Sequence, residues 1–457
     1  MPGGKSGLIA ADEPLRQAVE DAVQPEVPGV AVGVIATSVA EFACAGVTNS
    51  GDPQPVDEWT VFQLGSITKM VTATAVLILV QRGLLQLDEP VYHWLPSLSL
   101  PGNDRSLNVR HLLTHTAGWQ GAGFVELAPG NGARDGLTLC LESVSGLPQL
   151  ASPGTLWAYN NWGFAILGRL IEVTVGLPFE RAIHDLVIAP LGMTSCGFSA
   201  ADIAAAPWTS GHVSLDKGLV PVDPWILPRS ARPAGGLGAC LRDMMAFVRL
   251  HLLFEDSRAV LTEGSIRSMQ TWQSPAGALC DTGTGGMGLG WFMRKIDRQL
   301  LVYHEGAGVG HRSLLLLAPT RQFALVVLAN TDQRSILRLA DWALGHYLAV
   351  RVERTVLDLA PNQLLTYCGH YKSPGRELEI RPRGTGLRLV LAPQARGPSR
   401  LLTAGITLDA SFERADHVVV IDGRDQGIQG QFLRCSSEVM AFRLDGRVFV
   451  KQRAGSP

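Results

Sequence analysis

The chain has little charge and no excess of either sign. Charged residues make up 18% of the 457 residues, against about 25% in an average protein, and the formal net charge is −2. An extended basic surface for nucleic acid or for an anionic membrane is therefore excluded. Hydrophobic residues make up 46%, so a chain of this length can bury a large core, and extensive disorder is excluded.

The seven cysteines are scattered, odd in number and never form a C-x-x-C pair. This pattern argues against a disulfide framework or a zinc site, and it favours free thiols in a reducing compartment with no bound metal or cofactor. The first 17 residues contain no apolar stretch of the kind found in a signal peptide, and the most apolar run, residues 70–80, is shorter than a membrane span. We therefore expect a cytoplasmic protein with no membrane partner.

Hydrophobic periodicity divides the chain into residues 1–355 and 356–457. The first part mixes both kinds of element, which predicts an α/β domain. Helical spacing occurs in residues 12–24, 66–83, 162–176, 237–254 and 333–350, and strand-length runs occur in residues 27–37, 41–48 and onward from 286. The second part contains short alternating segments separated by Gly or Asp, and these predict an all-β domain with an antiparallel sheet or barrel.

A serine and a lysine lie three residues apart at the start of the apolar helix expected over residues 66–83. Side chains with this spacing share one helix face, so Ser66 and Lys69 are expected to be neighbours. Serine needs an adjacent base to act as a nucleophile, and burial lowers the pKa of a lysine toward that role. A capping serine and a solvated lysine explain the same pattern. Lysine occurs only six times in the chain, and the apolar surroundings of Lys69 favour the catalytic interpretation.

Two further motifs carry candidate catalytic groups. Tyr159 and Asn161 stand directly before the helix expected over residues 162–176, where a tyrosine can relay a proton and an amide can bind substrate. The alternative is that Asn161 caps the helix while Tyr159 packs. His304 and Gly306 end a strand, where a histidine titrates near neutral pH and a glycine lets a substrate approach the backbone. The alternative is a hairpin turn with an exposed histidine.

The order and spacing of S-x-x-K, Y-x-N and H-x-G resemble the serine β-lactamase and penicillin-binding-protein superfamily. The class C β-lactamase and esterase branch is most similar, because its third motif is K-T-G or H-x-G. Flanking segments such as VRHLLTHTAGW, SPGTLWAYNNWGFAILGRLIE and APLGMTSCGF also resemble this family, over residues 10–350. The resemblance implies a β-lactamase-like catalytic domain with an antiparallel sheet and a helical subdomain. The C-terminal part resembles the lipocalin-like domain of some members.

The resemblance also implies roles for single residues. Ser66 would be the nucleophile that forms an acyl-enzyme, and Lys69 would help to remove its proton and would tune Tyr159. Tyr159 would act as the general base in acylation and as the general acid toward the leaving group.

The remaining roles concern substrate binding. Asn161 would hold the substrate amide, and the backbone N–H groups of Ser66 and Ala307 would form the oxyanion hole. His304 would support Tyr159 or bind an anionic group in place of the family lysine. Histidine at this position is common among esterases, peptidases and acyltransferases of the superfamily. Gly306 would let the substrate approach the strand.

Two other patterns are set aside. The glycines of residues 306–310 mimic part of a dinucleotide-binding fingerprint, but a strand follows them where that fingerprint needs a helix. His111 and His115 have metal-ligand spacing, but Leu112 stands where a zinc protease needs glutamate. We interpret that region as a structural segment under the active site.

Three functions follow from these residues and from the resemblance. The main hypothesis is a stand-alone thioesterase of the penicillin-binding-protein type, which takes a peptidyl thioester from the carrier protein of a nonribosomal peptide synthetase and closes it head to tail. In that family an arginine of the C-terminal domain reaches the terminal group of the peptide, and Arg443 or Arg447 is the candidate here; the alternative is a solvated strand charge. The second hypothesis is an esterase, a D-aminopeptidase or a β-lactamase-like amide hydrolase. The third is a non-catalytic receptor, against which the retained motifs argue.

Overall fold

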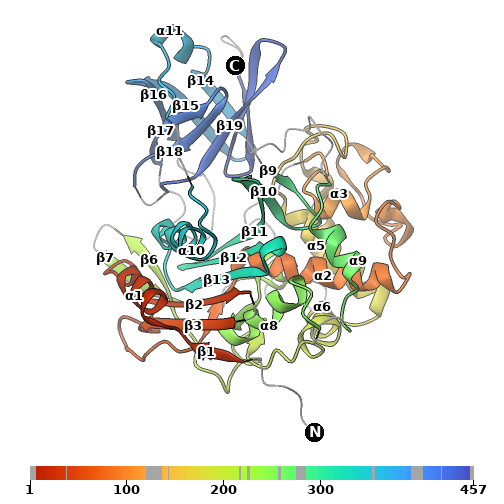
Figure 1. Cartoon of the computed structure of the whole chain (residues 1–457). Coiled ribbons are helices and arrows are strands. Elements are labelled where there is room, and N and C mark those ends of the chain that lie inside the picture. The colour runs from red at the N-terminus through yellow and green to blue at the C-terminus, as the bar shows by residue number, and fades with distance from the viewer. Residues whose placement is uncertain are drawn as a thin grey trace.

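The computed structural model describes residues 7–37, 39–119, 136–142, 144–215, 218–223, 227–255, 259–273, 285–352, 356–392, 405–423 and 425–452. These residues form a large α/β part and a β-barrel, which stands above it in Figure 1. The predicted fold classes, an α/β part followed by an all-β part, are confirmed. The boundary predicted at residue 355 lies outside the described residues and stays a prediction.

A mixed eight-stranded sheet forms the centre of the α/β part, in the order β1-β3-β2-β13-β12-β11-β10-β9. All neighbours are antiparallel except β1, which pairs in parallel with β3. The sheet therefore joins the N-terminal strands to the strands after residue 285. Its strands are β1 (Leu8–Ala10), β2 (Gly29–Ala36), β3 (Val39–Gly46), β9 (Gly285–Met287), β10 (Phe292–Ile296), β11 (Gln299–Gly308), β12 (His311–Ala318) and β13 (Phe323–Ala329).

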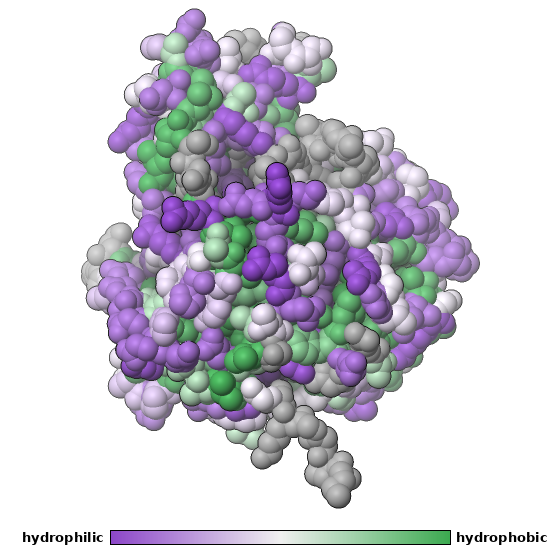
Figure 2. All heavy atoms as spheres, viewed as in Figure 1, coloured by the Kyte–Doolittle hydropathy of each residue, from purple (hydrophilic) through white to green (hydrophobic). Residues whose placement is uncertain are grey.

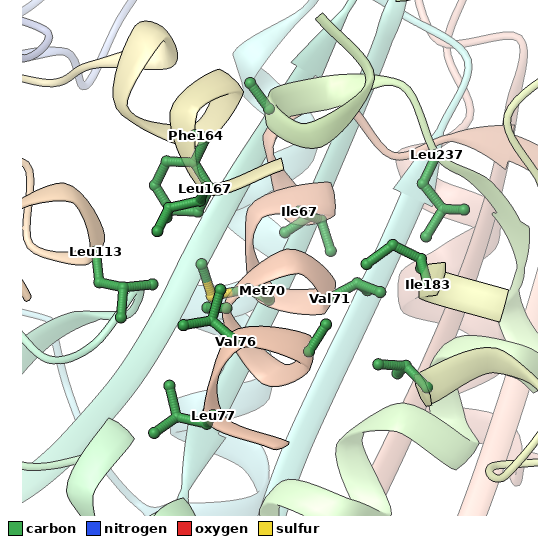
Figure 3. Close-up of a cluster of buried hydrophobic side chains, with 14 of the residues drawn as sticks. Ile67, Met70, Val71, Val76, Leu77, Leu113, Phe164, Leu167, Ile183 and Leu237 are labelled. Carbon is green, nitrogen blue, oxygen red and sulfur yellow. The ribbon is translucent and has the colours of Figure 1, made fainter. Parts of the chain in front are cut away.

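Helices cover both faces of the sheet. Because side chains alternate along a strand, Val32 of β2 packs with helices α1 (Glu13–Ala22) and α10 (Arg338–Leu348), and Ile35 packs with helices α2 (Thr68–Gln81) and α8 (Leu241–His251). Helix α2 is buried on all sides, as its apolar composition predicts. Figure 3 shows its side chains meeting Leu113, Phe164, Leu167, Ile183 and Leu237 from surrounding elements.

The helical subdomain packs around α2. Its central helix, α5, spans Asn161–Val175 and ends at Gly176 with φ +76°, as the glycine predicts. The other elements between residues 61 and 270 are β4 (Val61–Gln63), α3 (Val109–Leu113), α4 (Gly136–Glu142), α6 (Phe179–Ile183), β5 (Cys196–Gly197), β6 (Gly211–Leu215), β7 (Gly218–Val222), α7 (Arg232–Gly235), β8 (Gly238–Cys240) and α9 (Glu263–Met269).

One predicted helix boundary is wrong. The helix expected over residues 237–254 is confined to α8, because residues 238–240 are extended and form strand β8 between β4 and β5. The carboxylate of Asp243 in the first turn of α8 accepts hydrogen bonds from the amides of Thr194 and Ser195 at 3.0 and 2.8 Å. The helix therefore starts where its first turn can be anchored to the preceding loop.

The C-terminal strands close into an eight-stranded antiparallel barrel, β14 to β21 in sequence order. Closure removes the unpaired edges that an open sheet of short strands would expose. Tyr371, Phe412 and Phe442 lie in its core, and short helix α11 (Pro361–Leu364) precedes it. The strands are β14 (Gly369–Ser373), β15 (Arg376–Arg383), β16 (Gly386–Leu391), β17 (Ile406–Arg414), β18 (His417–Val420), β19 (Gln429–Cys435), β20 (Glu438–Leu444) and β21 (Arg447–Lys451).

The outer surface of the barrel packs on the segment that leads into α5. Leu156 and Ala158 of that segment form an apolar cluster with Leu433, Ala441 and Val448 of the barrel. On the face shown in Figure 2, hydrophilic side chains lie along the junction between the α/β part and the barrel. An apolar contact of this kind fixes the barrel against the segment just before Tyr159.

Among the described residues, no single helix is both long and apolar enough to cross a bilayer. Two consecutive helical segments, Asn161–Val175 and Phe179–Ile188, have the length and composition of a span only together, and the chain bends by 77° between them.

Candidate active site

Ser66 lies in a single 3₁₀ turn, Gly65–Ile67, that leads directly into α2. Gly65 has φ +52°, and a Cβ atom there would lie 2.5 Å from the carbonyl oxygen of Ala307. Only glycine fits this conformation and this contact without strain. The turn therefore lies directly against β11, and Ser66 and Ala307 line the same cleft.

Lys69 is fully buried one turn after Ser66. Its Nζ atom lies 3.2 Å from Ser66 Oγ, and it donates a hydrogen bond of 2.7 Å to the carbonyl of Ala234. Burial lowers the pKa of Lys69 well below its ordinary value, because the charged form loses its hydration. A neutral amine with a free lone pair is a competent base for the serine hydroxyl. The predicted neighbourhood of Ser66 and Lys69 is present in the structure.

Tyr159, on the segment before α5, also lies beside Ser66. Its hydroxyl is hydrogen-bonded to the Ser66 side chain, and Lys69 Nζ lies 4.8 Å from the centre of its ring. Burial raises the pKa of Tyr159 above its ordinary value. Tyr159 is therefore protonated at neutral pH and can donate its hydroxyl proton.

The two asparagines after Tyr159 have separate tasks. Asn160, and not Asn161, caps helix α5: its side-chain oxygen accepts a hydrogen bond from the amide of Gly163 at 3.1 Å. Its Nδ2 also donates to the carbonyl of Trp119 at 3.0 Å. Asn161 begins the helix and lines the cleft beside Ser66. Its position fits contact with a substrate amide.

His304 is buried on β11, 1% exposed, rather than lying in an exposed turn. Its Nδ1 atom lies 2.6 Å from the carbonyl of Glu305, so Nδ1 carries the proton and Nε2 is the acceptor. Burial, followed by repulsion from Lys69, lowers the pKa of His304 to about 3. Its ring centre lies 6.2 Å from that of Tyr159. A neutral imidazole supplies no positive charge for an anion.

The register of β11 places the backbone of Ala307 at an open sheet edge. Strand β10 pairs only with residues 299–303, so the end of β11 has a neighbour on one side, β12. The two-residue loop between Gly308 and His311 makes these residues a hydrogen-bonded pair of β11 and β12. The backbone N–H and C=O groups of Gly308, and of every second residue before it in β11, therefore point toward β12. Ala307 therefore directs its N–H toward the cleft, as an oxyanion-hole donor requires.

The loop after α3 (Val109–Leu113) packs against Tyr159. His115, with φ +57°, accepts the amide of Ala158 at its carbonyl (2.9 Å) and the amide of Asn160 at Nδ1 (3.0 Å). Its ring centre lies 4.4 Å from that of Tyr159. The predicted structural segment under the site is confirmed.

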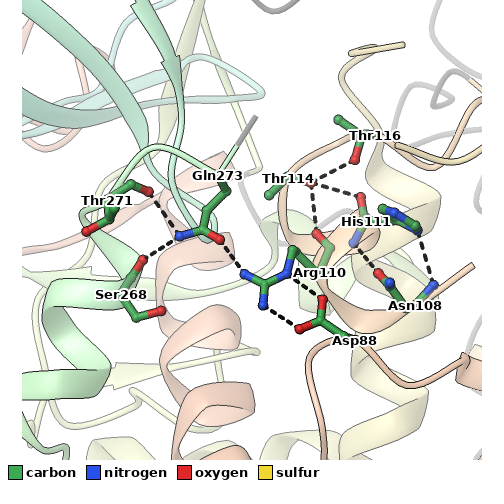
Figure 4. Close-up of polar contacts among 9 residues, drawn as sticks. All are labelled: Asp88, Asn108, Arg110, His111, Thr114, Thr116, Ser268, Thr271 and Gln273. Atoms are coloured by element: carbon green, nitrogen blue, oxygen red, sulfur yellow. Dashed lines mark hydrogen bonds and ion pairs between the residues drawn. The ribbon is translucent and has the colours of Figure 1, made fainter. Parts of the chain in front are cut away.

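A polar network holds the start of this loop (Figure 4). The Arg110 guanidinium donates to both carboxylate oxygens of Asp88, at 2.6 and 2.7 Å, and also to Gln273. Thr114 donates to the carbonyl of Arg110 at 2.8 Å. The asparagine Asn108 caps α3 by accepting the amide of His111 at 2.9 Å. His111 therefore has a capping role.

The barrel contributes directly to the site. The two-residue turn between β20 and β21 consists of Asp445 and Gly446, both with positive φ. The carbonyl of Gly446 accepts the amide of Tyr159 at 3.0 Å. Sequence reasoning missed this turn. Its Asp-Gly pair predicts a tight hairpin, but no local signal predicts the element on which the hairpin docks.

A cleft of about 620 Å³ lies between the sheet, α10 and the barrel, and Ser66 lines it. Arg443 lines it, with its guanidinium 4.9 Å from the ring centre of Trp157 and hydrogen-bonded to Gln431 at 2.8 Å. Arg447 is not among the lining residues and lies 3.4 Å from the carbonyl of Pro374. The residues that line this cleft include Ser66, Trp157, Tyr159, Asn161, Phe292, His304, Gly306, Ala307, Arg312, Arg334, Asp445 and Gly446.

Comparison with known proteins assigns this arrangement to a family. Residues 15–348 match the beta-lactamase family, and the chain belongs to it. Its members are serine hydrolases, among them beta-lactamases, esterases and amidases. Penicillin-binding protein 4 of Amycolatopsis lactamdurans is 33% identical over 365 residues, which cover 75% of this chain and 94% of that protein. Esterase EstB of Burkholderia gladioli is 38% identical over 182 residues, which cover 36% and 46% of the two chains.

The likeness in structure extends over both domains. SurE, a solved structure, superposes with a TM-score of 0.72 at 24% identity, covering 96% of this chain and 98% of its own. A second SurE structure, solved with D-Leu, gives a TM-score of 0.70. The predicted β-lactamase-like domain followed by a lipocalin-like β-domain is thereby confirmed.

Proposed function

We propose that this protein is a serine acyl-enzyme hydrolase or acyltransferase. One observation carries the proposal: the Ser66 hydroxyl is held between a buried Lys69 amine at 3.2 Å and the hydroxyl of Tyr159, at the mouth of a cleft. Burying a lysine in a protein core is unfavourable, because its charged form loses its hydration. Beside a serine the same burial is useful, because it lowers the lysine pKa and so provides a base.

The geometry supports an acylation step in which Lys69 is the resting base. The Ser66 proton passes to Lys69 Nζ, and Ser66 Oγ bonds to the substrate carbonyl carbon. The carbonyl oxygen becomes an oxyanion, which the N–H groups of Ser66 and Ala307 stabilise. When the tetrahedral intermediate collapses, the leaving group takes the hydroxyl proton of Tyr159, and Lys69 returns its proton to Tyr159. The product is an ester on Ser66.

The finer proposal is a stand-alone thioesterase that releases a nonribosomal peptide from its carrier protein and closes it head to tail. The barrel favours this function, because its residues form one wall of the cleft of about 620 Å³ that Ser66 also lines. The shared two-domain fold with SurE, which has been solved with D-Leu, supports a D-configured residue at the acyl position. A cytoplasmic location, close to a peptide synthetase, belongs to the same proposal.

Acyl-enzyme formation is tested by intact-mass spectrometry. An activated ester should add one acyl mass to the wild-type protein and none to Ser66→Ala. Labelling of the Ser66→Ala variant to the same extent would overturn the assignment of the nucleophile.

The cyclase activity is tested separately with a peptidyl thioester mimic that ends in a D-residue. The expected product is the cyclic peptide, formed when the N-terminal amine attacks the ester on Ser66. Hydrolysis alone across a panel of such peptides would reject the cyclase and leave the acyl-enzyme intact.

A second function, a generic esterase or D-amino amidase, is supported by the identity with Esterase EstB over part of the chain. It predicts rapid hydrolysis of short-chain esters or D-amino amides and no advantage for long peptides. A comparison of kcat/KM for a peptidyl thioester, a D-amino amide, a short-chain ester and a cephalosporin separates the two functions.

A further inference from the structure

A buried hydrogen bond joins the central sheet to the turn that carries Ser66. Ser313 of β12 stands directly opposite Gly306 of β11 in the pairing register and is 1% exposed. Its Oγ donates a hydrogen bond of 2.7 Å to the carbonyl of Leu64, two residues before the nucleophile. Directly opposite residues share one face of a sheet, so the hydroxyl of Ser313 lies over Gly306. The bond therefore fixes the turn relative to the strand that carries Ala307.

Gly306 leaves the space that this bond needs. A Cβ atom on Gly306 would lie 2.0 Å from Ser313 Oγ and 2.1 Å from the carbonyl oxygen of Leu64. Glycine is the residue that permits such a close approach of other groups to the backbone. Packing against the serine turn therefore explains the glycine of the H-x-G motif.

A second buried hydroxyl holds the next peptide group of the turn. Thr68 is fully buried, and its Oγ1 donates a hydrogen bond of 2.7 Å to the carbonyl of Gly65. The same Oγ1 accepts the amide of Leu237 at 3.1 Å. The carbonyl of Gly65 and the N–H of Ser66 belong to one planar peptide group. Holding this carbonyl therefore sets the direction of the Ser66 N–H.

We propose that the hydroxyls of Ser313 and Thr68 align the oxyanion hole. They hold the N–H of Ser66 in a set position relative to the N–H of Ala307. The inference rests on the proposed acyl-enzyme function and adds two positioning residues to it. Neither residue lines the cleft, so both act through the backbone. Fixed donors stabilise the oxyanion most, because no reorientation is needed when the charge develops.

The test compares p-nitrophenyl hexanoate with its thionoester, in which sulfur replaces the carbonyl oxygen, with spontaneous hydrolysis subtracted. Sulfur is the weaker hydrogen-bond acceptor, so an aligned oxyanion hole favours the oxygen ester. In Ser313→Ala and in Thr68→Val, kcat/KM for the oxygen ester should fall about tenfold or more, because a donor is displaced. The ratio of kcat/KM between the two esters should fall as well. Thr68→Ser keeps the hydroxyl and should keep the wild-type ratio.

Thr74→Val is the matched control. Thr74 is also fully buried, and its hydroxyl donates a hydrogen bond of 2.8 Å to the carbonyl of Met70, farther along α2. Its loss should lower stability by a similar amount and leave the ester ratio unchanged. Rates are expressed per Ser66 that an activated ester can acylate, as counted by intact mass, so that unfolded protein does not enter the comparison.

A wild-type ester ratio in Ser313→Ala or in Thr68→Val would overturn the positioning role of that residue. An equal loss of rate with both esters would do the same, because a general disturbance of the site slows both. If Ser313→Ala does not fold, Thr68→Val and Thr68→Ser decide the question. If neither ester acylates Ser66 in the wild type, the proposed function itself fails, and the two failures are thus distinguishable.

Discussion

The backbone amide of Tyr159 donates a hydrogen bond of 3.0 Å to the carbonyl of Gly446, which lies at the tip of a barrel hairpin 287 residues later in the chain. Together with the contacts of His115 to the amides of Ala158 and Asn160, this bond fixes the backbone on both sides of Tyr159. The barrel therefore helps to hold the segment that carries Tyr159.

Replacing Gly446 should impair catalysis more than stability. A Cβ at this position would lie 2.6 Å from Tyr159 Cβ, and the residue has φ +78°. We predict that Gly446→Ala lowers kcat by about tenfold, because small displacements of a catalytic group carry costs of this order or larger. The measurement is ester turnover alongside thermal unfolding.

Gly384→Ala separates displacement of Tyr159 from backbone strain. Gly384 also has positive φ, +58°, in a barrel turn, but a Cβ there meets nothing within 4 Å. It should lose a similar stability, about 1 kcal/mol, and keep its turnover. Equal kcat in the two variants would contradict a positioning role for the hairpin.

Lys69 should act only as a neutral amine. We predict that Lys69→Met slows acylation of Ser66 by about 100- to 10,000-fold, the usual contribution of a general base. Lys69→Arg should be equally slow, because a guanidinium stays protonated. In the wild type, acylation should fall as pH drops through the lowered pKa of Lys69, since protonation removes the lone pair. Stopped-flow or mass measurements against pH check this, and rapid acylation by Lys69→Arg would refute it.

Arg443 and Arg447 should differ in their effect on peptide substrates. Arg443 lines the cleft over Trp157, whereas Arg447 points to the carbonyl of Pro374 outside it. Arg443→Gln is expected to raise KM for a peptidyl thioester by about tenfold, as the loss of one charge-assisted contact does, and Arg447→Gln to change it by less than about twofold. The reverse order would assign the terminal group of the peptide to Arg447.

Buried neutral histidines should make the fold sensitive to acid. Burial lowers the pKa of His251 to about 3, whereas an unfolded chain has a histidine pKa of about 6.5. Between these values the unfolded chain binds a proton that the folded protein excludes. The free energy of unfolding therefore decreases as pH falls below about 6.5, by up to about 1.4 kcal/mol per pH unit for this residue.

We predict that His251→Phe flattens this dependence between pH 6 and pH 4, as measured by denaturant unfolding. The ring would stay between Phe247 and Trp291, and Thr74 would keep its hydrogen bond to the carbonyl of Met70. His370→Phe is the control, because His370 is solvent-exposed. An unchanged slope in His251→Phe would show that the acid sensitivity has another origin.

Local patterns determined which residues could meet within one element. The three-residue spacing of Ser66 and Lys69 fixes them on one helix face, and apolar neighbours on every side of α2 imply that Lys69 is buried. Alternation after residue 356 likewise indicated short antiparallel strands, because a strand with one buried face must alternate. The positive φ of Gly176 follows from its place at a helix end.

Only the tertiary structure decided what these elements face. Burial of His304 on β11 makes it neutral, and burial of Tyr159 raises its pKa, although both motifs are compatible with solvated, titrating side chains. The placement of Gly446 against Tyr159 and of Ser313 against Leu64 depends on how the barrel docks and how segments far apart in sequence pack. Such contacts arise from long-range packing and desolvation, and neither is encoded in the spacing of neighbouring residues.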